Sequence, residues 1–128
     1  MTLEQLAAVP QIVFPESYDL RSAVDSAFRA SDLAPAPVVA GAEMDAALRF
    51  VERGIGVAVV PAMVAVDRPA LRTHLLADES LNRTVSIARR SDMALTNAAA
   101  ALQRAIRSVA DRLADPGAPT TGLVSRAG

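Results

Sequence analysis

Polar side chains gather where a short apolar run gives way to a helical pattern. Ser17, Tyr18 and Arg21 follow the run at residues 11–14. Ligands of parallel α/β sheets collect beyond the carboxyl ends of strands, and free N–H groups at a helix start attract anions. Arg21 would add a guanidinium suited to a carboxylate. The alternative interpretation is that Ser17 only caps the helix and Arg21 is solvated, and the sequence leaves both open.

A second strand end carries Pro61 and Met63, directly after the apolar run at residues 57–60. A methionine there could line an adaptable apolar pocket, because its side chain is flexible and polarisable. The competing interpretation, which we favour, is that Met63 packs into the core.

The residues that commonly catalyse reactions are scarce. The chain has no Cys and a single His, His74. This excludes disulfides, thiol nucleophiles and multi-histidine metal sites. The carboxylate pairs Glu43/Asp45 and Asp78/Glu79 have no partner at metal-ligand spacing, and no Gly-x-Ser-x-Gly nucleophile motif occurs. We therefore expect no enzyme activity, no bound metal and no cofactor.

Gly54-x-Gly56 is not a dinucleotide-binding fingerprint. That motif requires the glycines after a strand and before a helix, whereas here the helical pattern precedes them and the apolar run follows. The two glycines are expected to permit a tight turn and close packing, with Gly54 ending the helix at 43–53.

Composition places the chain among α/β domains of ordinary size. Of its 128 residues, 52% are hydrophobic, the formal net charge is −1, and no basic stripe suited to phosphates is visible. Nucleic-acid binding by this chain is therefore not expected. No apolar run reaches the roughly 18–20 residues of a membrane span, and Met1–Gln5 does not resemble a signal peptide. The expected location is cytoplasmic.

Periodicity predicts the order βαβαβ, then ββα. That order is typical of an α/β fold with a mostly parallel sheet flanked by helices. The apolar run at 57–60 suits a strand covered on both faces. Strands are predicted at 11–14, 37–40, 57–60, 71–76 and 84–89, and helices at 18–31, 43–53, 61–66 and 96–114.

These segments, taken in order, resemble the second half of the effector-binding domain of LysR-type transcriptional regulators. The most distinctive is Leu48–Pro61, which combines a helix end, Gly-x-Gly, an apolar strand and a proline. The resemblance also includes residues 11–15, 20–28, 43–61, 71–76, 83–88 and the last helix. It implies one lobe of a domain similar to type 2 periplasmic binding proteins, with a C-terminal helix.

The resemblance implies a division of the chain and a binding site. Residues 1–9 would be a lead-in, 10–88 effector subdomain II, 89–114 a return segment and helix of subdomain I, and 115–128 a disordered tail. A small-molecule effector, for which an organic acid is a candidate, would contact Ser17, Tyr18, Arg21, Glu43 and Pro61. Relatives often have a small polar residue near Glu43, whose carboxylate would repel an anion unless Arg21 or another base paired with it.

The family's DNA-binding helix-turn-helix and the first half of its subdomain I have no counterpart in this sequence, so the chain is expected to be a truncated module. Its last helix carries an apolar stripe, Leu102, Ile106, Val109 and Leu113. That stripe is expected to fold back on the sheet or to pair with a second copy. The alternatives to effector sensing are an oligomerisation fragment that pairs with full-length regulators, and a solute-binding protein.

Overall fold

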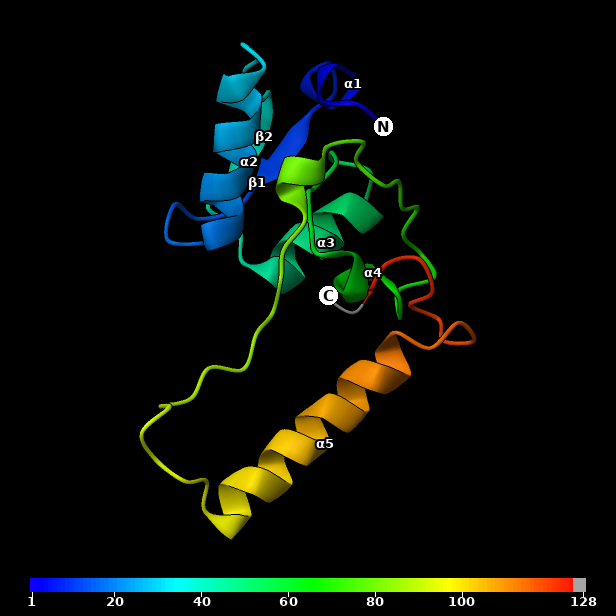
Figure 1. Cartoon of the computed structure of the whole chain (residues 1–128). Coiled ribbons are helices and arrows are strands. Elements are labelled where there is room, and N and C mark those ends of the chain that lie inside the picture. The colour runs from blue at the N-terminus through cyan, green and yellow to red at the C-terminus, as the bar shows by residue number, and fades with distance from the viewer. Residues whose placement is uncertain (126–128) are drawn as a thin grey trace. The chain divides into compact units, whose positions relative to one another are not determined.

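The computed structural model describes residues 1–125 and divides the chain into two compact units (Figure 1). The first unit, Met1–Asn82, contains helices α1 to α4 and the strands. The second unit starts at Arg83 and contains α5. The elements are α1 (Leu3–Ala7), β1 (Gln11–Val13), α2 (Asp19–Ala30), β2 (Pro37–Ala40), α3 (Met44–Glu52), α4 (Ala62–Ala65), a 3-10 turn η1 (Glu79–Leu81) and α5 (Asn97–Leu113).

The sheet is small and parallel. Strand β1 pairs in parallel with β2, and the other edge of β1 meets Val57 through a single parallel bridge. The amide of Ile12 donates to the carbonyl of Val57 (2.8 Å), and the amide of Val57 donates to the carbonyl of Pro10 (2.9 Å). The spatial order is therefore the 57–60 segment, then β1, then β2, and all three run the same way.

The prediction of a third full strand at 57–60 is wrong in its hydrogen bonding, since only Val57 joins the ladder. Its burial pattern is nevertheless that of a strand covered on both faces. Val57 and Val59 pack against a cluster built from α1 and α2, whereas Ala58 and Val60 pack against a cluster beside α3. Apolar burial is non-directional, so it holds this segment between two layers without a ladder.

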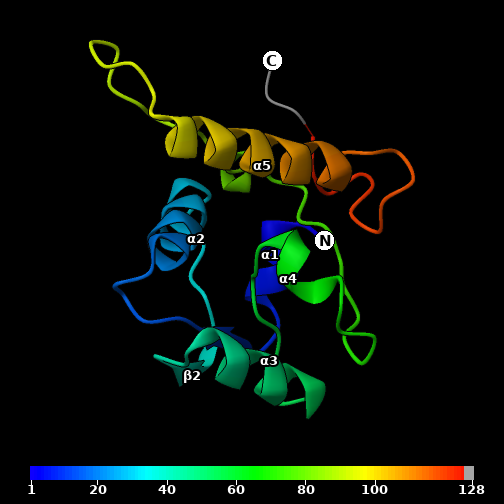
Figure 2. The same ribbon diagram turned by 90° about the horizontal axis from the view of Figure 1, so that it is seen from below.

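Helices cover both faces of the strands. Val24, Ala27 and Phe28 of α2 join Leu3 and Leu6 of α1 in one buried cluster. Ile12 and Phe14, in and just after β1, join Ala42 and Ala47 in the other. Figure 2 shows α2 and α3 well separated, as two layers require. The expected α/β architecture with a parallel sheet is present, in a smaller form than predicted.

Helices α2 and α3 end in the same backbone motif. After α3, the amide of Gly54 donates to the carbonyl of Val51 (2.8 Å) and that of Ile55 to Phe50 (3.1 Å), with Gly54 at φ +72°. This is the Schellman arrangement expected at Gly54. After α2, Asp32 takes the left-handed position at φ +56°. Gly56 has a different role, because a Cβ there would lie 2.7 Å from the carbonyl oxygen of Pro10.

Residues 1–9 are more than a lead-in. Thr2 and Gln5 form a reciprocal capping box at the start of α1, and Leu3 and Leu6 are buried in the core. A Thr followed three residues later by Gln is the sequence signature of such a cap.

Two further strand predictions, at 71–76 and 84–89, are wrong, because neither segment pairs with a strand. Leu75 and Val85 are 65% and 84% exposed. Alternation of apolar and polar residues gives side chains two faces, but it does not supply a neighbouring edge for the backbone.

The second unit contains the long helix that was predicted. Helix α5 begins after Thr96, whose hydroxyl accepts from the amide of Ala99 (3.2 Å), and none of its residues is fully buried. The expected disordered tail begins with hydrogen-bonded turns, among them Ala118 to Asp115 and Leu123 to Thr120. Residues 126–128 of that tail lie outside the described residues.

Candidate functional site

The strand order of the first unit places a topological switch point at one end of the strands. In doubly wound α/β sheets, ligands bind outside the carboxyl ends of strands, where neighbouring strands are followed by helices on opposite faces. Here β1 leads into α2 on one face and its neighbour β2 leads into α3 on the other, while the 57–60 segment lies along the other edge of β1. Four predicted site residues follow these strand ends. We call Ser17, Tyr18, Glu43 and Pro61 the strand-end rim.

Tyr18 and Glu43 are directly bonded across the rim. The Tyr18 hydroxyl donates a hydrogen bond to Oε2 of Glu43, although the residues lie 25 positions apart. Tyr18 is the N-cap residue of α2 and Glu43 that of α3, and neither side chain caps its own helix. The bond therefore joins the starts of two helices. It also raises the pKa of Tyr18 above its ordinary value, because the carboxylate favours the protonated phenol.

The Tyr18 ring stacks on the buried ring of Phe14. The two rings stack with centroids 5.6 Å apart and planes inclined by 5°. Phe14 is fully buried, whereas Tyr18 is half-buried. Offset stacking adds to the area that the rings bury and fixes the ring plane. The hydroxyl of Tyr18 is thus positioned by the core.

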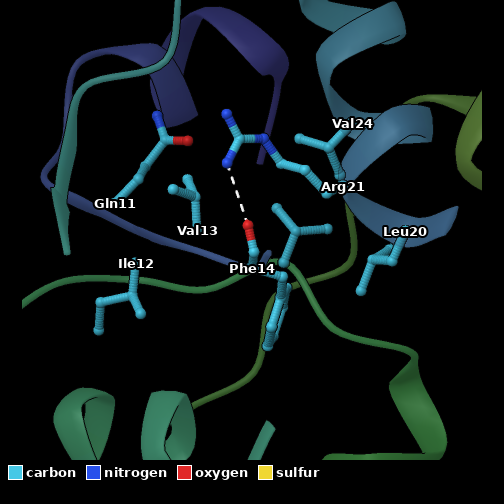
Figure 3. A pocket seen from close by; sticks show the side chains of 8 residues that line it. Gln11, Ile12, Val13, Phe14, Leu20, Arg21 and Val24 are labelled. Carbon is cyan, nitrogen blue, oxygen red and sulfur yellow. Dashed lines mark hydrogen bonds between the residues drawn. The ribbon is translucent and has the colours of Figure 1, made fainter. Parts of the chain in front are cut away.

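Arg21 does not pair with Glu43. Its Nε donates to Oδ2 of Asp25 (2.7 Å), and its Nη1 donates to the carbonyl oxygen of Phe14 (3.0 Å). Only 21% of the Arg21 side chain is exposed. Figure 3 shows the guanidinium reaching back to the Phe14 carbonyl between β1 and α2. The charge of Arg21 is therefore already engaged by a carboxylate and a backbone dipole.

The space beside Arg21 is too small for an organic ligand. It is a cavity of about 20 Å³. A cavity needs about 10–15 Å³ to hold a water molecule, whereas ligand pockets span several hundred Å³. The cavity can hold one water. Its lining residues are Gln11, Ile12, Val13, Phe14, Leu20, Arg21, Val24 and Val59.

The remaining rim residues, Ser17 and Pro61, follow β1 and the 57–60 segment. Ser17 is exposed. The interpretation of Ser17 as the N-cap of α2 is wrong, because Tyr18 occupies that position. Pro61 precedes α4, and its carbonyl accepts from the amide of Val64 (2.9 Å). Tyr18 packs on the buried cluster beside α3. So do Met44, which follows Glu43, and Val60, which precedes Pro61. The prediction that Met63 packs in the core is wrong, since it is half exposed.

Two contributors to this region were missed from the sequence. Asp25 neutralises Arg21, and its position four residues later on a helix is a recognised ion-pair spacing. Phe14 supports Tyr18, and a spacing of four residues across a proline gave no signal for that contact.

Across the described residues, no group of three or more His, Asp or Glu side chains is placed to hold a metal ion. Within that same part of the chain, none of the helices has the length and apolar character needed to cross a membrane.

Comparison with known proteins identifies the family. Residues 1–111 match the model of the LysR substrate binding domain, a domain of transcriptional regulators. The HTH-type transcriptional regulator SsuR of Burkholderia cenocepacia is 35% identical over 63 residues, which are 49% of this chain and 20% of that protein. This chain thus spans about a fifth of the length of that curated relative. No solved structure matches. The family match covers most of the chain, which therefore belongs to the LysR substrate-binding domain family.

Proposed function

We propose that this chain is part of the effector-sensing module of a LysR-type regulator and binds a small molecule at the strand-end rim. The observation that carries the proposal is the bond between Tyr18 and Glu43. It joins two helix starts at the edge of the sheet where α/β domains bind ligands. The proposal requires no covalent chemistry at the rim and assigns the chain to the cytoplasm.

The proposal retains the predicted division of the chain. Residues 10–88 would form the ligand-binding lobe, and 89–114 would return to the other lobe of a complete domain. A ligand held between two lobes favours the closed arrangement by its differential affinity for that arrangement. The described rim is one wall of such a site. This fits the absence of a ligand-sized cavity beside Arg21.

Tyrosine fluorescence tests the proposal directly. Tyr18 is the only Tyr, and the chain has no Trp, so its emission reports the rim alone. We expect at least one member of a library of small metabolites to change this emission saturably at millimolar concentration and to raise the melting temperature. Tyr18→Phe should abolish the stabilisation while leaving the circular dichroism spectrum unchanged. If no library member stabilises the wild-type chain, the proposal fails.

A second candidate function is oligomerisation, which the surface of α5 favours. Leu102, Ile106 and Val109 are 62%, 44% and 45% exposed and recur at helical spacing. An exposed apolar stripe of this kind commonly marks an interface. Light scattering after size exclusion tests it. Ile106→Glu should reduce the mass of the wild-type species to that of one chain, whereas Arg107→Glu should not.

A further inference from the structure

Resting on the proposed function, we propose that the strand-end rim selects ligands carrying a protonated amine or a guanidinium, and discriminates against carboxylates. The combination of the Tyr18–Glu43 bond with the engagement of Arg21 carries this proposal.

Within the described part of the chain, the rim carries an unpaired negative charge on Glu43. The Glu43 carboxylate is exposed, and it accepts one hydrogen bond from Tyr18. A carboxylate has about four lone-pair sites, so it can accept further bonds from a ligand. An ammonium group has three donors and no acceptor, and it matches this unmet capacity. A ligand carboxylate would meet Glu43 as a like charge.

Arg21, the residue that could have attracted an anion, is already engaged. Its Nε and Nη1 are committed to Asp25 and to the Phe14 carbonyl. The adjoining cavity of about 20 Å³ admits a water but not a ligand carboxylate. Freeing Arg21 would leave Asp25 without its partner.

The N–H groups at the two helix starts would by themselves favour an anion. Each start already carries acidic residues. Glu16 and Asp19 flank Tyr18 at α2, and Glu43 and Asp45 open α3. Of these, Asp45 is paired with Arg68 (2.8 Å). These charges satisfy the helix dipoles from within the chain. The half-buried ring of Tyr18, held in place by the buried Phe14, offers the alkyl part of a ligand an apolar surface beside Glu43.

The test uses three probes of four carbon atoms each, with different headgroups: butylammonium, butyrate and butanol. Each is titrated into the full chain, and Tyr18 emission is followed. We expect butylammonium to bind most tightly, because it alone can pair with Glu43. Since that pair is exposed, Glu43→Gln should weaken binding only by about three- to fivefold. The glutamine retains an acceptor for the Tyr18 hydroxyl, so the rim keeps its geometry.

Glu52→Gln is the matched control. Glu52 ends the helix that Glu43 opens, nine residues or about 13 Å away along the axis, and its partner is Arg68. The substitution removes the same charge from the same helix and should leave butylammonium binding unchanged. If both variants weaken binding equally, general attraction to an acidic surface explains the result and the inference is overturned.

The remaining outcomes separate this inference from the proposed function. Tighter binding of butyrate than of butylammonium overturns the inference but preserves a ligand site at the rim. The same holds if no butyl probe binds while a library compound stabilises the chain in a Tyr18-dependent manner. If neither the probes nor the library produce a response, both proposals fail.

Discussion

Helices α2 and α5 carry similar amphipathic patterns, yet their apolar faces differ in burial. Val24, Ala27 and Phe28 of α2 are buried against α1 and the 57–60 segment, whereas α5 has no fully buried residue. Amphipathicity in a sequence shows that a helix has a face to cover; it does not show that the same chain covers it. The first unit supplies partners for its helices, and the stripe of α5 is available to another surface.

The largest expected effect comes from truncating a buried side chain in α2 and an exposed one in α5. Phe28 is 1% exposed, and Phe28→Ala should lower the free energy of unfolding by about 3–5 kcal/mol. Ile106→Ala should change it by less than about 0.5 kcal/mol, because Ile106 is 44% exposed. Urea unfolding followed by circular dichroism, at a concentration where the chain is monomeric, measures both. Equal losses would show that α5 is buried as deeply as α2.

Glycines sharpen the same comparison. A Cβ at Gly56 would lie 2.7 Å from the Pro10 carbonyl oxygen, whereas one at Gly117 in the second unit would meet nothing closer than 3.7 Å. Gly56→Ala should therefore displace the 57–60 segment from the edge of β1 and destabilise the chain by about 1–3 kcal/mol. Gly117→Ala should be nearly neutral. The same urea experiment checks both. A neutral Gly56→Ala would mean that the backbones of Pro10 and Gly56 separate without cost.

Loss of the N-cap of α5 should destabilise α5 without affecting the core of the first unit. Thr96→Ala removes the hydroxyl that accepts from the Ala99 amide and should cost α5 about 1 kcal/mol of helix stability. Since α5 has no fully buried residue, the loss should appear as faster amide hydrogen exchange in residues 97–101, while amides of α2 keep their protection. Thr96→Ser retains the acceptor and serves as the control. Faster amide exchange throughout α2 in the alanine variant would contradict independent behaviour of the two units.

Local signals predicted most of the fold correctly. Strands β1 and β2 and helices α2, α3, α4 and α5 lie where periodicity placed them, and Gly54 ends α3 as expected. Helices α2, α3 and α5 were predictable because their hydrogen bonds are local and their apolar residues recur with the helical period. The strands at 71–76 and 84–89 were not, because a strand depends on an edge elsewhere in the chain.

For the candidate site, the sequence indicated where residues lie along the strands but not which side chains they contact. That Tyr18 and Glu43 follow neighbouring parallel strands could be inferred from their place after apolar runs, and the structure brings them together. The pairing of Arg21 with Asp25 could not be decided in the same way, because the sequence offers both Glu43 and Asp25 as carboxylate partners for Arg21. The helical spacing of Arg21 and Asp25 makes their pair local, so it forms without any rearrangement of the loops.

The smallest expected effect is also the most specific to the rim. Because its bond to Glu43 raises the pKa of Tyr18, the phenol should ionise above its ordinary value of 10.0 in the folded chain. The contribution of this bond to stability is then complete below pH 10 and is lost as the pH rises through the folded-state pKa. Absorbance at 295 nm reports this residue alone, since the chain has one Tyr and no Trp. Glu43→Gln should move the transition toward 10, because the amide carries no charge to oppose phenolate formation. Glu52→Gln should leave it in place, and an unshifted transition in the wild-type chain would mean that the two side chains are not bonded in solution.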